Sequence, residues 1–234
     1  MQQAQAAVTL RGLQKSFPLG NGRVLEILNI PQLVLPVGSA TVLTGLSGSG
    51  KTTLLNLIAG IAVPSAGKIW VHNADIFALP EPQRDRFRAQ HIGYIFQTFN
   101  LLAPFTALEN VMLSMLFAPV MARSEQRQRA QCLLSQLGLS ARLHHKPPQL
   151  SRGEQQRVTI ARALANNPPL VLADEPCANL DARTAQVVLA ALLTICRQAH
   201  KTLLLVSHDV TVLGAADRVL DMAEINRAVG MEPV

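Results

Sequence analysis

The sequence GLSGSGKT occupies residues 45–52, and it decides how the rest of the chain is interpreted. It matches the pattern G-x-x-x-x-G-K-S/T and follows a short apolar run, Ala40–Leu43, while a helical pattern begins near Thr53. Glycines let a backbone curl so that successive N–H groups face an anion, and the N-terminus of the next helix adds its positive dipole end. A strand, this loop and a helix in that order predict a P-loop that binds nucleotide phosphates.

Individual residues of this loop have predicted roles in binding a nucleoside triphosphate. Lys51 would reach the β- and γ-phosphates, where it is also a catalytic candidate, and the Thr52 hydroxyl would bind Mg²⁺. The alternative is an ordinary loop rich in glycine and serine, which the flanking strand and helix disfavour. The predicted nucleotide contacts in this segment are Gly45, Leu46, Ser47, Gly48, Ser49, Gly50, Lys51, Thr52 and Thr53.

A second apolar run, Leu170–Ala173, ends in the acidic pair Asp174 and Glu175. A P-loop ATPase needs one carboxylate in the metal shell and one group that positions water. We assign the first role to Asp174 and the second, catalytic role to Glu175. Acids at a strand end can instead cap the next helix, but Pro176 follows at once and the P-loop is already present.

The stretch LSRGEQQR, residues 150–157, contains no evident nucleophile, base or metal cage. Taken alone it indicates the start of a helix, because Ser151 and Glu154 have the spacing of a capping box and apolar residues follow at partly helical intervals.

Together these motifs resemble one family, the ATP-binding cassette ATPases. LSRGEQQR resembles the family's signature, usually LSGGQ, and Gln97, after the apolar run Ile92–Phe96, resembles the Q-loop glutamine. Asp181, in the sequence ANLD, resembles the D-loop residue, and His208 resembles the switch histidine. Five motifs stand in the family's order and cover nearly the whole chain.

The resemblance implies ATP and Mg²⁺ as cofactors and gives each matched residue a role. Gln97 would bind the nucleotide and join Thr52 and Asp174 around the metal, while His208 would act in catalysis beside Glu175. As alternatives, Gln97 is a plain strand-end amide and His208 a histidine satisfied by neighbouring backbone.

Two cassettes of this family associate head to tail, with ATP sandwiched between them. In such a homodimer Ser151 and the N–H of Gly153 would meet the γ-phosphate held by the partner's P-loop. Asp181 would also contact nucleotide, although N-L-D before a helix is also a plain cap. Phe17 resembles the aromatic residue that stacks on adenine, and core packing is its alternative.

Strands alternate with helices along the chain, which indicates an α/β fold. Another buried strand is expected at Leu203–Val206, and apolar residues at 130, 133, 134 and 137 predict a helix that stops at Gly138. Residues 98–165 show no strand, so we predict a helical subdomain there, inserted into a core of residues 1–97 and 166–234. The resemblance adds a P-loop NTPase core with a mostly parallel sheet and an N-terminal antiparallel β portion.

Composition narrows the partners and the location. The net charge of +6 permits anionic partners without specifying one, whereas 49% hydrophobic and only 15% charged residues suggest apolar surface covered by another protein. No apolar run reaches the roughly 18 residues of a spanning helix, and the first residues lack the blocks of a secretory signal. Three widely spaced cysteines fit a reducing cytosol. We expect a peripheral protein on the cytoplasmic face of the inner or plasma membrane.

Two segments, residues 92–102 and 106–111, resemble the lipoprotein-release and macrolide-export branch (LolD-type and MacB-type cassettes). This implies an integral-membrane permease that exports or extracts hydrophobic or amphipathic cargo. Arg152 and Glu154 depart from the usual signature, and Cys177-Ala178 replaces the usual Thr-Gly. Activity is still expected because Ser151 and Gly153 remain.

Two other functions are compatible with the same motifs. The first is an ATPase that signals to cell-wall enzymes through a membrane partner. The second is a cassette ATPase acting on DNA or ribosomes, which the basic balance would suit. The chain has neither the long coiled-coil insertion nor the second cassette of those types, so no nucleic-acid partner is expected.

Overall fold

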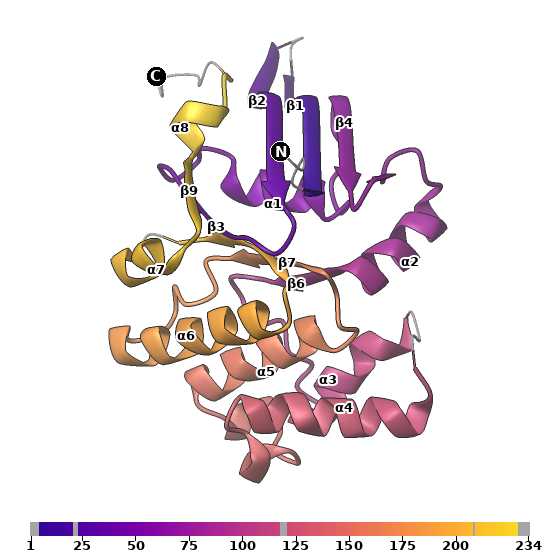
Figure 1. The fold of residues 1–234 in the computed structure, drawn as a ribbon, viewed down its shortest axis with the longest axis vertical. Coiled ribbons are helices and arrows are strands. Elements are labelled where there is room, and N and C mark those ends of the chain that lie inside the picture. Colours follow the sequence, from indigo (N-terminus) through magenta and orange to yellow (C-terminus); the bar gives the residue numbers. More distant parts are fainter. Residues whose placement is uncertain (1–4, 21–22, 118–120, 208, 229–234) are drawn as a thin grey trace. The chain divides into compact units, whose positions relative to one another are not determined.

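The computed structural model describes residues 5–20, 23–117, 121–207 and 209–228 (Figure 1). The chain forms two compact units, one of residues 1–85 with 204–234 and one of residues 86–203. The predicted division into a core and a subdomain of residues 98–165 stays a prediction.

The first unit contains an antiparallel sheet in the strand order β2-β1-β4-β5. Alternate residues of β1, such as Val8 and Leu10, are fully buried, and their partners Leu35 and Leu33 on β2 are buried too, so one face of the sheet is apolar. This is the antiparallel β portion that was expected. The strands are β1 (Ala6–Gly20), β2 (Arg23–Pro36), β4 (Ala66–Val71) and β5 (Ala74–Asp75).

The same unit carries the P-loop between β3 (Ala40–Thr44) and α1 (Lys51–Ile58). β3 pairs in parallel with β9 (Arg218–Asp221), which places Asp221 beside Thr44 at the end of β3. The predicted strand at Ala40–Leu43 is therefore confirmed. Helix α1 begins two residues before Thr53, because Gly50 caps it in a left-handed conformation. Two short helices complete the unit: α7 (Val210–Ala215) and α8 (Met222–Ile225).

The second unit is mostly helical around a parallel strand pair. Strands β6 (Ile92–Ile95) and β7 (Leu170–Asp174) pair with Ile95 opposite Ala173, so their carboxyl ends meet at one edge. Helices α3, α4 and α5 pack on one another. The helices and short 3₁₀ turns are α3 (Ala107–Leu116), α4 (Arg123–Gln136), η1 (Ser140–Arg142), η2 (Pro147–Gln149), α5 (Arg152–Leu164) and α6 (Ala182–Gln198).

Several predicted elements of this unit are confirmed. The strands begin at Ile92 and Leu170 as expected, and α4 ends just before Gly138, whose φ is 72°. Between residues 98 and 165 the described residues form helices and turns only. Two elements reach the limits of the units: α2 (Glu81–His91) and β8 (Thr202–Val206), the latter predicted as Leu203–Val206.

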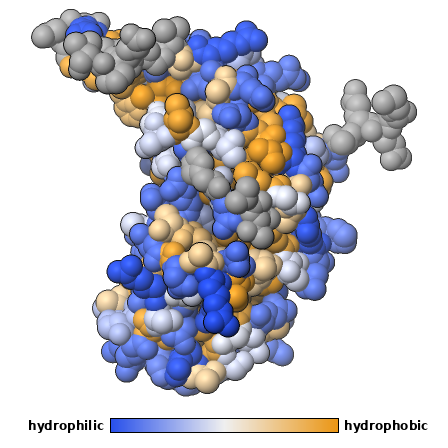
Figure 2. Space-filling view, turned by 90° about the vertical axis from the view of Figure 1, so that its left-hand side faces the viewer, coloured by the Kyte–Doolittle hydropathy of each residue, from blue (hydrophilic) through white to orange (hydrophobic). Residues whose placement is uncertain are grey.

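The surface exposes apolar side chains among hydrophilic ones, as the face drawn in Figure 2 shows. Phe117 and Leu116 are 79% and 49% exposed at the end of α3, and Leu102 and Phe105 are exposed before its start. Of the described helices, not one combines the length and the apolar character that crossing a bilayer requires. The three cysteines are free thiols, as expected.

Candidate nucleotide-binding site

The P-loop adopts a conformation that its glycines make possible. Gly45 and Gly50 have φ values of 140° and 94°, which L side chains rarely adopt. A Cβ at Gly45 would lie 2.8 Å from the Met222 Cβ, and one at Gly50 would lie 2.7 Å from the Leu28 Cδ2. Backbone angle and lack of space both require glycine at these two positions.

Lys51 and Ser49 supply polar groups at this loop. The Lys51 ammonium donates to the carbonyl oxygens of Gly45 and Leu46, at 2.7 and 2.9 Å, and the residue is only 7% exposed. The Ser49 hydroxyl is buried and has no hydrogen-bond partner in the structure. An unpaired buried hydroxyl is costly, so its presence in a glycine-rich loop suits a site completed by an anionic ligand. Thr52 is exposed and Thr53 is half-buried.

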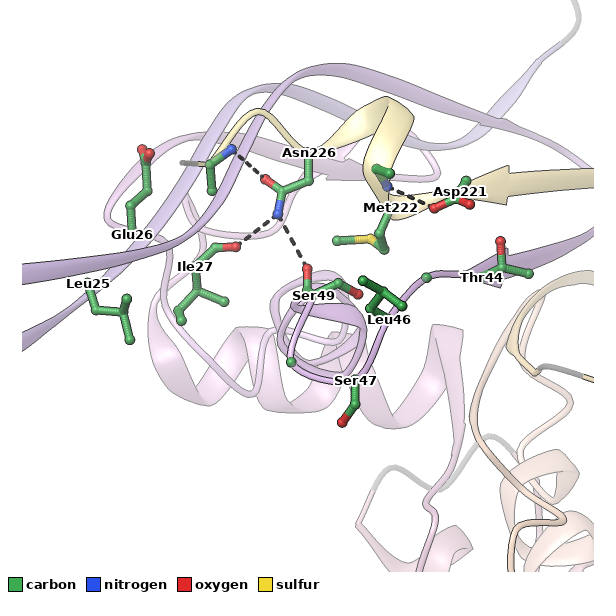
Figure 3. Close-up of a pocket in the computed structure, with 14 residues that line it drawn as sticks. Leu25, Glu26, Ile27, Thr44, Leu46, Ser47, Ser49, Asp221, Met222 and Asn226 are labelled. Atoms are coloured by element: carbon green, nitrogen blue, oxygen red, sulfur yellow. Dashed lines mark hydrogen bonds between the residues drawn. The ribbon is translucent and has the colours of Figure 1, made fainter. Parts of the chain in front are cut away.

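A cavity of about 820 Å³ adjoins the loop and is shown in Figure 3. Its volume is within the range of small-molecule and cofactor sites. Strand β2, the P-loop and the segment after β9 form its walls. The lining residues are Leu25, Glu26, Ile27, Thr44, Gly45, Leu46, Ser47, Gly48, Ser49, Asp221, Met222, Ala223, Asn226 and Ala228.

Phe17 lies on β1 opposite Leu25, a residue that lines this cavity. Its side chain is 44% exposed, so core packing is the wrong alternative for this ring. The Lys15 ammonium lies 4.7 Å from the ring centroid and also donates to the carbonyl of Val63. One face of the ring therefore contacts a cation, as in other cation–π pairs.

The second unit brings the predicted carboxylates and Gln97 to one edge of the β6-β7 pair. Asp174 ends β7 and is 5% exposed. Burial first, and then the negative charge of Asp174, raise the pKa of Tyr94 above its usual value. Glu175 follows with a φ of 41°, a left-handed conformation that is strained for a non-glycine residue. The exposed Gln97 follows β6, and its carbonyl accepts a hydrogen bond from Asn179 at 3.4 Å.

Ser151 is the N-cap of α5, and the predicted capping box is confirmed. The Ser151 Oγ accepts from the Glu154 N–H at 3.2 Å, and the Glu154 carboxylate accepts from the Ser151 N–H at 2.8 Å. Arg142 Nε donates to the other Glu154 oxygen at 2.9 Å. The hydrogen bond from the Ser151 backbone, and further the bond from Arg142, lower the pKa of Glu154 despite partial burial. Ser151 and Arg152 remain exposed.

Asp181 is the N-cap of α6, as its cap alternative predicts. Its carboxylate accepts from the Thr184 N–H at 3.0 Å, which is also the first cause of its lowered pKa. A contact of Asp181 with nucleotide stays a prediction.

His208 lies outside the described residues. The sequence had also given no reason to include Asp221, Met222 or Asn226 among the site residues, yet all three line the cavity. The segment after Leu220 showed only that it departs from the hairpin of the resembled family, and that departure was the one available signal.

Comparison with known proteins gives a consistent picture. The family model described as ABC transporter matches residues 28–178. The lipoprotein-releasing system ATP-binding protein LolD of Pseudomonas fluorescens is 43% identical over 222 residues, which are 94% of this chain and 96% of that protein. The macrolide export ATP-binding/permease protein MacB of Rhodopirellula baltica is 43% identical over 93% of this chain but only 32% of its own length.

A solved structure resembles the whole chain. It is the dimeric structure of a post-hydrolysis state of the ATP-binding cassette MJ0796 bound to ADP and Pi, with a TM-score of 0.84 and 35% identity. The match covers 97% of this chain and 100% of that one.

Proposed function

Because this chain belongs to the ABC transporter family, whose ATP-binding subunits are ATPases, we propose that it powers a membrane permease that extracts or exports hydrophobic or amphipathic cargo. The observation that carries this proposal is the 43% identity to a lipoprotein-releasing ATP-binding protein across 94% of this chain and 96% of that protein. The similarity to a macrolide export protein, which carries a permease in the same chain, points to the same kind of partner.

The P-loop is the proposed site of the ATP phosphates. Glycine-enforced curvature, the nearby Lys51 ammonium and the orphaned Ser49 hydroxyl together provide N–H, cationic and hydroxyl groups for phosphate oxygens. Phe17 is proposed to stack on the adenine ring, since its cross-strand neighbour Leu25 lines the cavity.

Mg²⁺ fits the chemistry of the proposed donor residues. Thr52, Gln97 and Asp174 offer hydroxyl, amide and carboxylate oxygens, which are the ligand types that Mg²⁺ prefers. When bound, the ion would neutralise charge on the transferring phosphate. Glu175 is proposed to orient the attacking water and accept its proton, with His208 assisting.

The signature is proposed to act on the ATP of a second copy of the chain. Ser151 stands at an exposed helix N-terminus, and Gly153 follows in the first turn. Such an end presents N–H groups and a positive dipole to an anion. A dimeric relative bound to ADP and Pi supports this head-to-tail arrangement.

The permease is proposed to dock on the apolar residues at the two ends of α3, on the cytoplasmic face of the membrane. Leu102, Phe105, Leu116 and Phe117 are exposed there. Asn110, fully buried, accepts from the Leu102 N–H and donates to the Leu102 and Phe105 carbonyls, so it fixes the loop before the helix. A rigid apolar surface of this kind is typical of protein interfaces.

The decisive experiment is purification of the tagged chain from its own membranes in mild detergent. An integral-membrane protein should co-purify, and reconstituted vesicles should release amphipathic cargo when ATP is added. Phe117→Ser should weaken this association, whereas Val187→Ser, at a 55% exposed position on α6, should not. ATP hydrolysis without cargo release would favour signalling to cell-wall enzymes. Salt-sensitive retention on DNA or ribosomes, with no membrane partner, would overturn the proposal.

A further inference from the structure

The segment after β9 returns to the P-loop, although no recognised motif lies in it. Thr44 Oγ1 donates to the Leu220 carbonyl at 3.2 Å, which ties this segment to the strand that leads into the loop. Asp221 then caps α8 by accepting from the Ala223 N–H at 2.8 Å. The helix is short, and Asn226 follows it directly.

The Asn226 side chain connects three segments through four hydrogen bonds (Figure 3). Its Oδ1 accepts from the N–H groups of Asn29 and Ala228, at 2.8 and 3.1 Å. Its Nδ2 donates to the carbonyls of Ile27 and Ser49, at 3.0 and 3.3 Å. Both donors and both acceptor sites of the amide are therefore used, which leaves one orientation for the group.

The bond to Ser49 has a consequence for the next residue. The structure has no cis peptide bond among its described residues, and a planar trans peptide points its carbonyl and the following N–H in opposite directions. A hydrogen bond that holds the Ser49 carbonyl toward Asn226 therefore also directs the Gly50 N–H away from Asn226. Gly50 is the N-cap of α1, where the N–H groups of the loop and helix converge.

The opposite end of the loop meets the same segment. Met222 Cβ lies 2.8 Å from the position of a Cβ at Gly45. The P-loop is thus held at its first residue by packing and at its fifth by a hydrogen bond.

The geometry assigns Asn226 as a positioning residue: its amide orients the Ser49–Gly50 peptide so that the Gly50 N–H binds a nucleotide phosphate. This inference rests on the proposed binding of ATP phosphates at the P-loop. It predicts that loss of the Nδ2 donor weakens binding in proportion to the phosphates present, which a purely structural contact would not do.

The test compares Asn226→Asp with the unaltered full-length chain by calorimetric titration with ADP, AMP and adenosine. Aspartate retains the acceptor for Asn29 and Ala228 but cannot donate to Ser49. Loss of one hydrogen bond to a charged group should weaken ADP binding on the order of 10-fold or more, with adenosine binding unchanged. Asn226→Ala should weaken ADP binding at least as much; if it fails to fold, Asn226→Asp decides.

Asn166→Asp is the matched control. Asn166 is 8% exposed, and its Nδ2 likewise donates to two backbone carbonyls, those of Ala89 and Ser114, at 2.8 and 3.0 Å. It should lose thermal stability but keep its ADP affinity.

The possible results separate the inference from the function on which it rests. Unchanged ADP affinity in a folded Asn226→Asp chain overturns the inference, as does equal weakening for ADP and adenosine. Failure of the unaltered chain to bind any adenine nucleotide would instead overturn the proposed ATP site.

Discussion

Gly153 and Thr184 are so close that no side chain fits at position 153. A Cβ built on Gly153 would lie 2.5 Å from Thr184 Cγ2. Thr184 is also the residue whose N–H is capped by Asp181, so the first turns of α5 and α6 are packed and capped together. The signature glycine therefore has a packing role that is independent of any phosphate contact.

A double-mutant cycle would separate these two roles of Gly153. Gly153→Ala should destabilise the chain by about 1–3 kcal/mol through overpacking, measured by urea unfolding. Adding Thr184→Ala removes the clash and should recover much of that stability. Recovery of stability together with full ATP-dependent dimerisation would show that glycine is needed there for packing alone; a remaining loss of dimerisation is the expected result.

Glu175→Gln should lower ATP hydrolysis by about 10²–10⁴ while nucleotide binding persists, because glutamine keeps the shape but not the base. Size-exclusion chromatography with Mg-ATP should then show an ATP-dependent homodimer, or a locked complex with the permease. Glu175→Gln that retains near-normal turnover would reassign the catalytic base.

Ser151→Arg, placed on the Glu175→Gln background, should abolish that dimer without removing ATP binding by the monomer. The exposed Ser151 is the proposed contact to the partner's γ-phosphate, and arginine places bulk there. If the double variant still dimerises on ATP, Ser151 acts only as the helix cap seen in the structure.

Phe17→Ala should weaken ATP binding by on the order of 1–3 kcal/mol, the range of aromatic stacking on bases. Phe17→Trp should restore binding, since stacking needs a flat ring. Leu19→Ala is the control, because Leu19 is a comparably exposed apolar residue of the same strand. Fluorescence titration with a nucleotide analogue measures both, and equal affinities of the parent and Phe17→Ala would show that the ring does not touch adenine.

Glu154 should make stability pH-dependent on the acid side. Its pKa is lowered in the folded chain, so its contribution is present above the ordinary value of 4.5 and is lost as pH falls through the lower folded pKa. Glu154→Gln should therefore flatten the acid limb of a urea-unfolding series. Arg142→Gln should retain most of it, because the Ser151 N–H is the larger cause. Identical acid limbs in all three chains would contradict this origin.

Local sequence patterns predicted the elements whose causes are local. Apolar runs gave the strands at Ile92 and Leu170, and the glycine spacing of residues 45–52 gave the loop, since few other conformations suit such residues. The start of α1 was placed two residues late because the N-cap is Gly50, whose left-handed φ is invisible in an apolar pattern.

Contacts between distant positions could not be predicted in this way. Asn226 looks like an ordinary polar residue in the sequence, and its bonds to Ile27 and Asn29 join positions nearly two hundred residues apart. Similarly, the pairing of Arg142 with Glu154 explains how an acid is accommodated in the signature, but only the fold brings the two residues together.

The bond from Asn226 to Ser49 also sets the order of events during synthesis. The two residues are 177 positions apart, so at about 5–20 residues per second the ribosome makes Asn226 roughly 10–35 s after Ser49. Throughout that interval the nascent P-loop lacks one of the groups that shape it. The emerging chain would therefore acquire its full affinity for nucleotide only when translation has almost reached its last residues.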